Sequence, residues 1–218
     1  MNKTMLQLKL NFKESFIYDW IYDIRQRFLD QDNRKWQDWV NKGSRFPTPH
    51  VVKQLTVKKY AKLFSLNTLI ETGTYRGDML YATKGVFKRL FSLELDADFY
   101  ERARRRLSKF NHISIIHGDS GEKLPELLSA IDEPCLFWLD AHAATGDQGC
   151  PLMQELNHIF NHPITDHVIL IDDAQKFTGE LDFPEIDSLR ELVKTKRPGW
   201  VFEVKDYIIR IHPSPTDN

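Results

Sequence analysis

The spacing of hydrophobic residues divides the chain into a helical first part and a longer second part built from short apolar runs. Between Phe12 and Leu29 hydrophobic residues recur every three or four positions, which predicts an amphipathic helix. Trp36, Trp39 and Val40 continue this spacing more weakly. We therefore expect helices in this first part.

A break follows at RFPTP, residues 45–49, because proline disfavours a helix in the residue before it. Thr48 and Pro49 have the residue types of a helix cap and a first helical position, and the next helix should run to about Phe64. We expect residues 1–64 to form an N-terminal helical extension that acts as a lid or a dimer contact. The sheet domain should then cover residues 65–218.

Five short apolar runs follow Asn67, namely TLIET, LFSLEL, ISIIHG, CLFWLD and HVILIDD, with helical spacing between them. Strands that alternate with helices in this way favour a parallel sheet covered on both faces. The last two runs, WVFEV and YIIRIHP, are separated only by Lys205 and Asp206, which predicts an antiparallel hairpin. The expected fold class is α/β, with a doubly wound, mostly parallel sheet closed by a C-terminal antiparallel hairpin.

Composition narrows the classes of partner. The chain has 218 residues, of which 41% are hydrophobic, and 30 basic against 31 acidic residues give a net charge of −1. This balance gives no reason to expect nucleic acid or a membrane as a partner. The two cysteines, Cys135 and Cys150, do not form a disulfide or zinc pattern, and the first twenty residues lack a continuous apolar run. We expect a soluble cytoplasmic protein.

Polar residues with possible chemistry follow the predicted strands, where ligands of such sheets bind. ETGTYRG ends the first strand, and its Gly73 and Gly77 let the backbone approach a ligand closely. Glu94 ends the second strand and could accept both hydroxyls of a ribose, and Asp119 with Ser120 follows the third strand, where an adenine could be bound. The alternative is that each of these residues only caps a helix or forms a turn.

Taken in order, these residues resemble the class I S-adenosylmethionine-dependent methyltransferases over roughly residues 67–213, with their Rossmann-like fold and terminal hairpin. The resemblance implies that the glycine loop holds the methionine part of the cofactor, Glu94 its ribose, and Asp119 with Ser120 its adenine. Carboxylates suit a ligand that carries a sulfonium cation and no phosphate. The cofactor-binding residues expected from this resemblance are Glu71, Gly73, Thr74, Tyr75, Gly77, Glu94, Leu95, Asp119, Ser120 and Asp140.

Three further acids end the fourth and fifth predicted strands, and they suggest a metal site. Asp140, Asp172 and Asp173 would repel one another if they met unpaired, and a divalent cation would remove that conflict. Oxygen ligands favour Mg²⁺, Mn²⁺ or Ca²⁺, of which we rank Mg²⁺ first. A cation bound to an acceptor hydroxyl would lower its pKa, and His142 is placed to act as the general base. Alternatively, the two adjacent acids only cap a turn and His142 only bonds a loop carbonyl.

The LDAH and IDD segments are similar to LDGD and IDD in the macrocin-type sugar O-methyltransferases, which implies metal binding by the same three acids. Histidine at position 142, where those enzymes have an acid, is a departure. The ETGTY, GDSG, FWLDAH and ILIDDA segments also resemble a bacterial group of class I methyltransferases.

The sequence thus predicts a metal-assisted O-methyltransferase that acts on a hydroxyl of a small glycosidic or natural-product acceptor. Alternatives are a metal-independent methyltransferase with His142 as base, and a module that binds S-adenosylmethionine without turnover. A nucleotide-sugar oxidoreductase is disfavoured because Gly-x-x-x-Gly lacks a glycine of the dinucleotide motif. The expected partner is a small molecule, with a homodimer as a further option.

Overall fold

A computed structural model of the chain describes residues 32–140, 150–180 and 182–214. The chain divides into two compact units, residues 1–45 and residues 46–218. The amphipathic helix predicted over residues 12–29 lies outside the described residues. The described part of the first unit contains α3 (Asp32–Asn41), where the weaker helical spacing predicted a helix.

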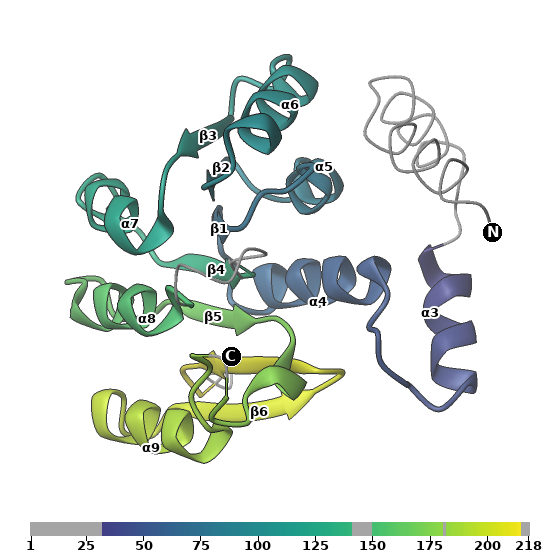
Figure 1. The fold of residues 1–218 in the computed structure, drawn as a ribbon, viewed down its shortest axis with the longest axis vertical. Coiled ribbons are helices and arrows are strands. Elements are labelled where there is room, and N and C mark those ends of the chain that lie inside the picture. The colour runs from purple at the N-terminus through teal and green to yellow at the C-terminus, as the bar shows by residue number, and fades with distance from the viewer. Residues whose placement is uncertain (1–31, 141–149, 181, 215–218) are drawn as a thin grey trace. The chain divides into compact units, whose positions relative to one another are not determined.

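The described part of the second unit contains one seven-stranded sheet in the order β3-β2-β1-β4-β5-β7-β6 (Figure 1). Neighbouring strands from β1 to β5 pair in parallel, whereas β7 pairs antiparallel with both β5 and β6. This confirms the predicted mostly parallel α/β sheet with a terminal hairpin. The strands are β1 (Thr68–Thr72), β2 (Arg89–Glu94), β3 (Ile113–His117), β4 (Cys135–Leu139), β5 (Val168–Ile171), β6 (Val201–Lys205) and β7 (Ile208–His212).

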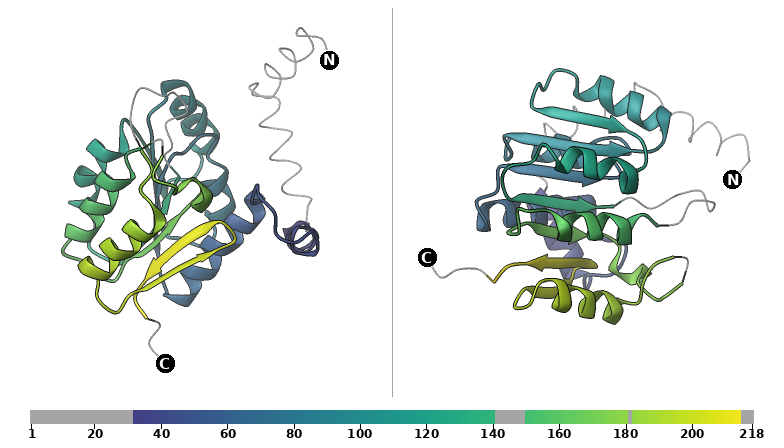
Figure 2. Two further views of the ribbon diagram at one scale, coloured as in Figure 1. Left: turned by 60° about the horizontal axis from the view of Figure 1, so that its bottom comes forward. Right: turned by 90° about the vertical axis from the view of Figure 1, so that its left-hand side faces the viewer.

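Helices cover both faces of this sheet (Figure 2). Phe137 of β4 packs in a core cluster with α7, α8 and α9, while its neighbours Leu136 and Trp138 pack in a second cluster with α4, α5 and α6. Because both faces of the strand are buried, apolar residues run through it without alternation. The helices are α4 (His50–Leu63), α5 (Asp78–Thr83), α6 (Ala97–Leu107), α7 (Ser120–Leu128), α8 (Leu152–Asn161), the 3₁₀ helix η1 (Ala174–Lys176) and α9 (Ile186–Lys196).

The terminal hairpin turns one residue later than the sequence predicted. Lys205 pairs with Ile208, so the turn consists of Asp206 and Tyr207, both in the left-handed region with φ of 57° and 60°. Two such residues form the type I′ turn that matches the twist of a hairpin. The Thr48 hydroxyl donates to the Asp206 carbonyl at 2.9 Å, so the prediction that Thr48 caps α4 was wrong.

The sheet-bearing unit begins at Phe46, ahead of the boundary predicted at residue 65. Its first helix, α4, contributes Val57 and Tyr60 to the same buried cluster as Leu69 and Leu136 of the sheet. The predicted role of residues 1–64 as a lid or dimer contact stays a prediction. None of the helices in the described residues is long and apolar enough to cross a membrane.

Two buried histidines, His162 and His167, form a hydrogen-bonded chain that begins at Cys135, the first residue of β4. The Cys135 amide donates to His167 Nδ1 at 3.0 Å, so the proton of this imidazole resides on Nε2. His167 Nε2 therefore donates to His162 Nδ1 at 3.0 Å, and His162 Nε2 donates to the Leu128 carbonyl at 3.0 Å. Each ring donates one bond and accepts one, an arrangement that requires both rings to be neutral.

Acid should therefore weaken the fold through His167. Burial is the main cause that lowers the pKa of His167 from 6.5 to about 4, and the positive charge of Arg197 adds to it. The stabilisation from the neutral ring is complete above pH 6.5 and is lost as the pH falls toward 4. Replacement by asparagine, which does not titrate, should reduce the acid-induced loss of unfolding free energy by about 2 to 3 kcal/mol.

Urea denaturation of wild type and His167→Asn at neutral and acid pH measures this difference. His117→Asn, which removes an exposed histidine, is the matched control. An equal loss of stability on acidification in wild type and His167→Asn would contradict the assignment.

Candidate active site

A pocket of about 1030 Å³ lies at the carboxyl ends of the parallel strands. It is lined by residues that follow neighbouring strands, among them Gly73 after β1, Glu94 at the end of β2, Asp119 after β3 and Asp140 after β4. The chain proceeds from β1 outward to β3 on one side and from β4 to β5 on the other, so the pocket lies where the strand order reverses.

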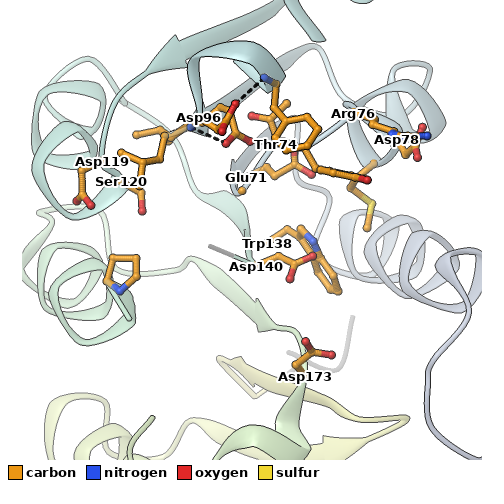
Figure 3. A pocket seen from close by; sticks show the side chains of 18 of the residues that line it. Glu71, Thr74, Arg76, Asp78, Asp96, Asp119, Ser120, Trp138, Asp140 and Asp173 are labelled. Atoms are coloured by element: carbon orange, nitrogen blue, oxygen red, sulfur yellow. Dashed lines mark hydrogen bonds between the residues drawn. The ribbon is translucent and has the colours of Figure 1, made fainter. Parts of the chain in front are cut away.

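Most of the residues predicted to bind the cofactor come together in this pocket. In Figure 3, Asp119 and Ser120 lie on one side, and Arg76 with Asp78 on the opposite side. Gly77 is the exception among the predicted residues, because it does not line the pocket. The predicted residues that do so are Glu71, Gly73, Thr74, Tyr75, Glu94, Leu95, Asp119, Ser120 and Asp140.

Gly77 is required for packing. It precedes α5 in the left-handed region, with φ of 74°, and a Cβ atom there would lie 2.8 Å from Leu107 Cδ1 of α6. A larger residue would therefore be strained and would displace the Leu107 side chain. The second glycine of ETGTYRG thus brings α5 and α6 together and contributes no surface to the pocket.

Glu94 is held rigidly at the pocket edge. Its carboxylate accepts hydrogen bonds from the Tyr75 amide at 2.7 Å and the Asp96 amide at 3.0 Å, one on each oxygen. Each carboxylate oxygen has two lone pairs, so both oxygens can accept a further bond from a ligand hydroxyl. Two backbone amides thus fix the direction in which Glu94 presents its charge.

Glu71 lies deeper, at the floor of the pocket. The Ser92 hydroxyl donates to Glu71 at 2.6 Å, and because a hydroxyl has one proton, Thr74 must be the donor in its 2.6 Å contact with Ser92. Burial raises the pKa of Glu71 well above its usual range, although the Ser92 hydrogen bond opposes this effect. Glu71 is only 2% exposed, so it shapes the floor beneath the glycine loop.

Asp119 and Ser120 both serve the start of α7 as well as the pocket. Asp119 caps this helix by accepting the Glu122 amide at 3.2 Å, which is the cap alternative stated for the sequence. The Ser120 hydroxyl donates to Glu155 of α8 at 2.5 Å, and burial raises the pKa of Glu155 to about 7. The cap of α7, Asp119, and its first residue, Ser120, therefore both line the pocket.

Two of the three acids predicted to bind a metal are already paired with basic side chains of the protein. Asp172 forms an ion pair with Lys53 of α4 and accepts the Asp173 amide at 2.8 Å. Lys176 Nζ pairs with the Asp173 carboxylate at 2.7 Å. Burial alone would raise the pKa of Asp173, but the hydrogen bonds from Lys176 and Gln175 outweigh it and lower that pKa. Among the described residues, no three histidine, cysteine, aspartate or glutamate side chains form a group that could hold a metal ion.

Lys53 supplies positive charge to this acidic cluster. Burial alone would lower the pKa of Lys53, but the charges of the three aspartates outweigh it and raise that pKa. Burial, followed by the negative charge of Asp172, raises the pKa of Asp140 well above its ordinary value, and Lys53 opposes this. The described donors therefore do not fit the predicted metal centre, because Lys53 already pairs with Asp172 and Lys176 with Asp173.

The predicted general base, His142, lies outside the described residues. Sequence reasoning missed His50, Lys53 and Lys176, which all line the pocket. The first two belong to α4, which the sequence assigned to the N-terminal extension, and no spacing pattern links them to a strand end. Asp96 and Phe99 also line the pocket, and the position of Asp96 just after β2 could have indicated it.

Comparison with known proteins supports the fold. No protein-family model and no curated protein matches the sequence. Solved structures do match. An O-methyltransferase from Bacillus cereus in complex with S-adenosylhomocysteine is 13% identical, with a TM-score of 0.55 over 84% of this chain and 91% of that chain.

Two other solved structures match with similar sequence identity, coverage and TM-score. TomG, an O-methyltransferase from Streptomyces achromogenes in complex with S-adenosylmethionine, is 16% identical over 84% of this chain and 87% of that chain, with a TM-score of 0.55. A methyltransferase from Podospora anserina bound to S-adenosylhomocysteine is 15% identical over 91% and 95% of the two chains, also with a TM-score of 0.55. The chain has the fold of class I methyltransferases, and the narrower resemblance to macrocin-type enzymes stays a prediction.

Proposed function

We propose that this chain is an S-adenosylmethionine-dependent methyltransferase that acts on an oxygen of a small acceptor. The observation that carries the proposal is the pocket at the reversal of strand order, with Glu94 and Asp119 at the ends of adjacent strands. Fold neighbours that hold S-adenosylmethionine or its demethylated product add support.

The charges that line the pocket suit this ligand better than a dinucleotide. Glu94, oriented by two backbone amides, would accept ribose hydroxyls, and Asp119 would accept the adenine amino group. With Asp96, these carboxylates would repel a pyrophosphate but attract a cation. S-adenosylmethionine, when bound, supplies a methyl group on a positively charged sulfur.

The protein's contribution to such a transfer is mainly positioning. A bound acceptor needs its oxygen held in line with the methyl group, and fixing two reactants in this geometry removes much of the entropic barrier. The end of the pocket near β4 and β5, lined by Lys53, Asp140 and Asp173, is where we place the acceptor. A glycosidic or natural-product hydroxyl, with His142 as base, remains our proposal for the acceptor and the proton transfer.

The divalent cation predicted from the sequence does not enter this proposal. The ion pair of Lys53 with Asp172 and the bond of Lys176 to Asp173 engage two of its three expected ligands. We therefore favour the metal-independent alternative.

Thermal unfolding with added ligands tests the function. A ligand that binds only the folded protein at 100 times its dissociation constant stabilises it by about 2.7 kcal/mol, which raises the melting temperature by several degrees. We expect this shift with S-adenosylhomocysteine and none with NAD. A larger shift with NAD, or no shift with S-adenosylhomocysteine, would contradict the proposal.

A further inference from the structure

The acceptor end of the pocket contains an ammonium group that the proposed function does not use. Lys53 comes from the first turn of α4 and reaches across to Asp172 at the end of β5, 119 residues further along the chain. The side chain of Asp172 is 1% exposed and that of Lys53 is 14% exposed. The Asp172 carboxylate is therefore buried, whereas the Lys53 side chain lines the pocket.

Because Asp172 is buried, its carboxylate needs a counter-charge close by. A carboxylate inside a protein costs several kcal/mol unless a counter-charge compensates it, and here the protein's own side chain provides that charge. Asp140 and Asp173 line the pocket beside Lys53, and both act electrostatically on it. A divalent cation at the same place would have to displace an ammonium that the three carboxylates hold. Lysine and metal are thus mutually exclusive occupants.

An ammonium group can act on the acceptor as a metal would. It has three N–H donors, of which Asp172 takes one, and it carries a full positive charge at the pocket surface. A hydrogen bond from such a donor is strengthened when its acceptor becomes negative. In a site that excludes water, a fixed charge aimed at a developing anion is a large source of rate enhancement.

We propose that Lys53 is the resident cation of the acceptor site: its ammonium, anchored by Asp172, donates a hydrogen bond to the acceptor oxygen and stabilises negative charge there without a metal. This proposal rests on the proposed function. The acceptor oxygen gives up its proton to the general base of the proposed function and forms its bond to the methyl carbon as the carbon–sulfur bond breaks and leaves its electron pair on sulfur. Lys53 stays protonated throughout.

Two measurements on the S-adenosylhomocysteine complex test the proposal. Calorimetric titration of wild type with Mn²⁺ should give only the heat of dilution, and saturable one-site binding would overturn the proposal. Absorbance of para-nitrophenol, whose ionised form is coloured, reports charge stabilisation on the bound oxygen. We expect wild type to raise the ionisation constant of the bound phenol about tenfold, as a nearby positive charge should.

Lys53→Met should abolish this enhancement, whereas Lys59→Met, on the exposed side of the same helix, should keep it. Because Lys53→Met leaves Asp172 buried without a partner, Lys53→Met/Asp172→Asn provides a variant without the charge pair and should lose the enhancement equally. If wild type does not ionise the phenol more readily than this double variant, including by failing to bind it, the proposal is overturned.

Binding of S-adenosylhomocysteine separates the two proposals. Lys53 lies at the end of β5, which β1 and β4 separate from the strands of Glu94 and Asp119. The variants should therefore bind this ligand within about threefold of wild type, as expected for the loss of a group outside its contacts. Failure of wild type to bind it would contradict the proposed function. Normal binding with no effect of Lys53 on the phenol would contradict the role of Lys53 alone.

Discussion

Glu94→Ala should weaken the binding of S-adenosylhomocysteine by about a hundredfold or more. In the proposed function its carboxylate accepts hydrogen bonds from the ligand, and the Tyr75 and Asp96 amides hold it in one orientation. Hydrogen bonds to a charged group contribute about 1.5 to 3 kcal/mol each, so the loss of two such bonds to the ribose hydroxyls corresponds to about 3 kcal/mol or more. Isothermal titration calorimetry measures the dissociation constant directly.

The matched control is Glu101→Ala on α6, whose carboxylate is exposed and pairs with Arg104. This variant should bind the ligand as wild type does. Circular dichroism and the melting temperature of Glu94→Ala show whether the fold survives the loss of two amide partners. A dissociation constant within threefold of wild type in a folded Glu94→Ala protein would show that Glu94 does not contact the ligand.

Phe137→Ala should cost about 3 to 5 kcal/mol of unfolding free energy, the usual range for removing a fully buried aromatic side chain. Phe137 is 0% exposed on β4, which lies between β1 and β5, and its ring meets His167 edge to face at 5.1 Å between centroids. Since a whole domain is stable by only about 5 to 15 kcal/mol, this loss is a large fraction of the total. Urea denaturation at neutral pH measures it.

Val204→Ala serves as the control, because Val204 lies on the edge strand β6 and is 41% exposed. It should lose less than about 1 kcal/mol, as most surface substitutions do. Similar losses in the two variants would mean that the face of β4 toward α7 and α8 is not the main core.

The elements of the sheet unit could be predicted from local pattern. Helices cover both faces of β4 and β5, so every residue of these strands is buried. Such strands appear in the sequence as continuous apolar runs, which can be recognised without the structure. Glu94 and Asp119 were identified because the carboxyl end of a parallel strand is where such sheets bind ligands. The same reasoning assigned Gly77 to the ligand, whereas its actual contact is Leu107, 30 residues away in the sequence.

The metal prediction illustrates the limit of such reasoning. The sequence by itself determined that Asp140, Asp172 and Asp173 would follow neighbouring strands, since strand ends can be read from short apolar runs. Only the tertiary structure decided that Lys53 would pair with Asp172, because α4 packs on the sheet through Val57 and Tyr60 and carries its lysine to a partner 119 residues away. Local spacing records which side chains share an element, whereas the compensation of a buried charge depends on which elements pack together.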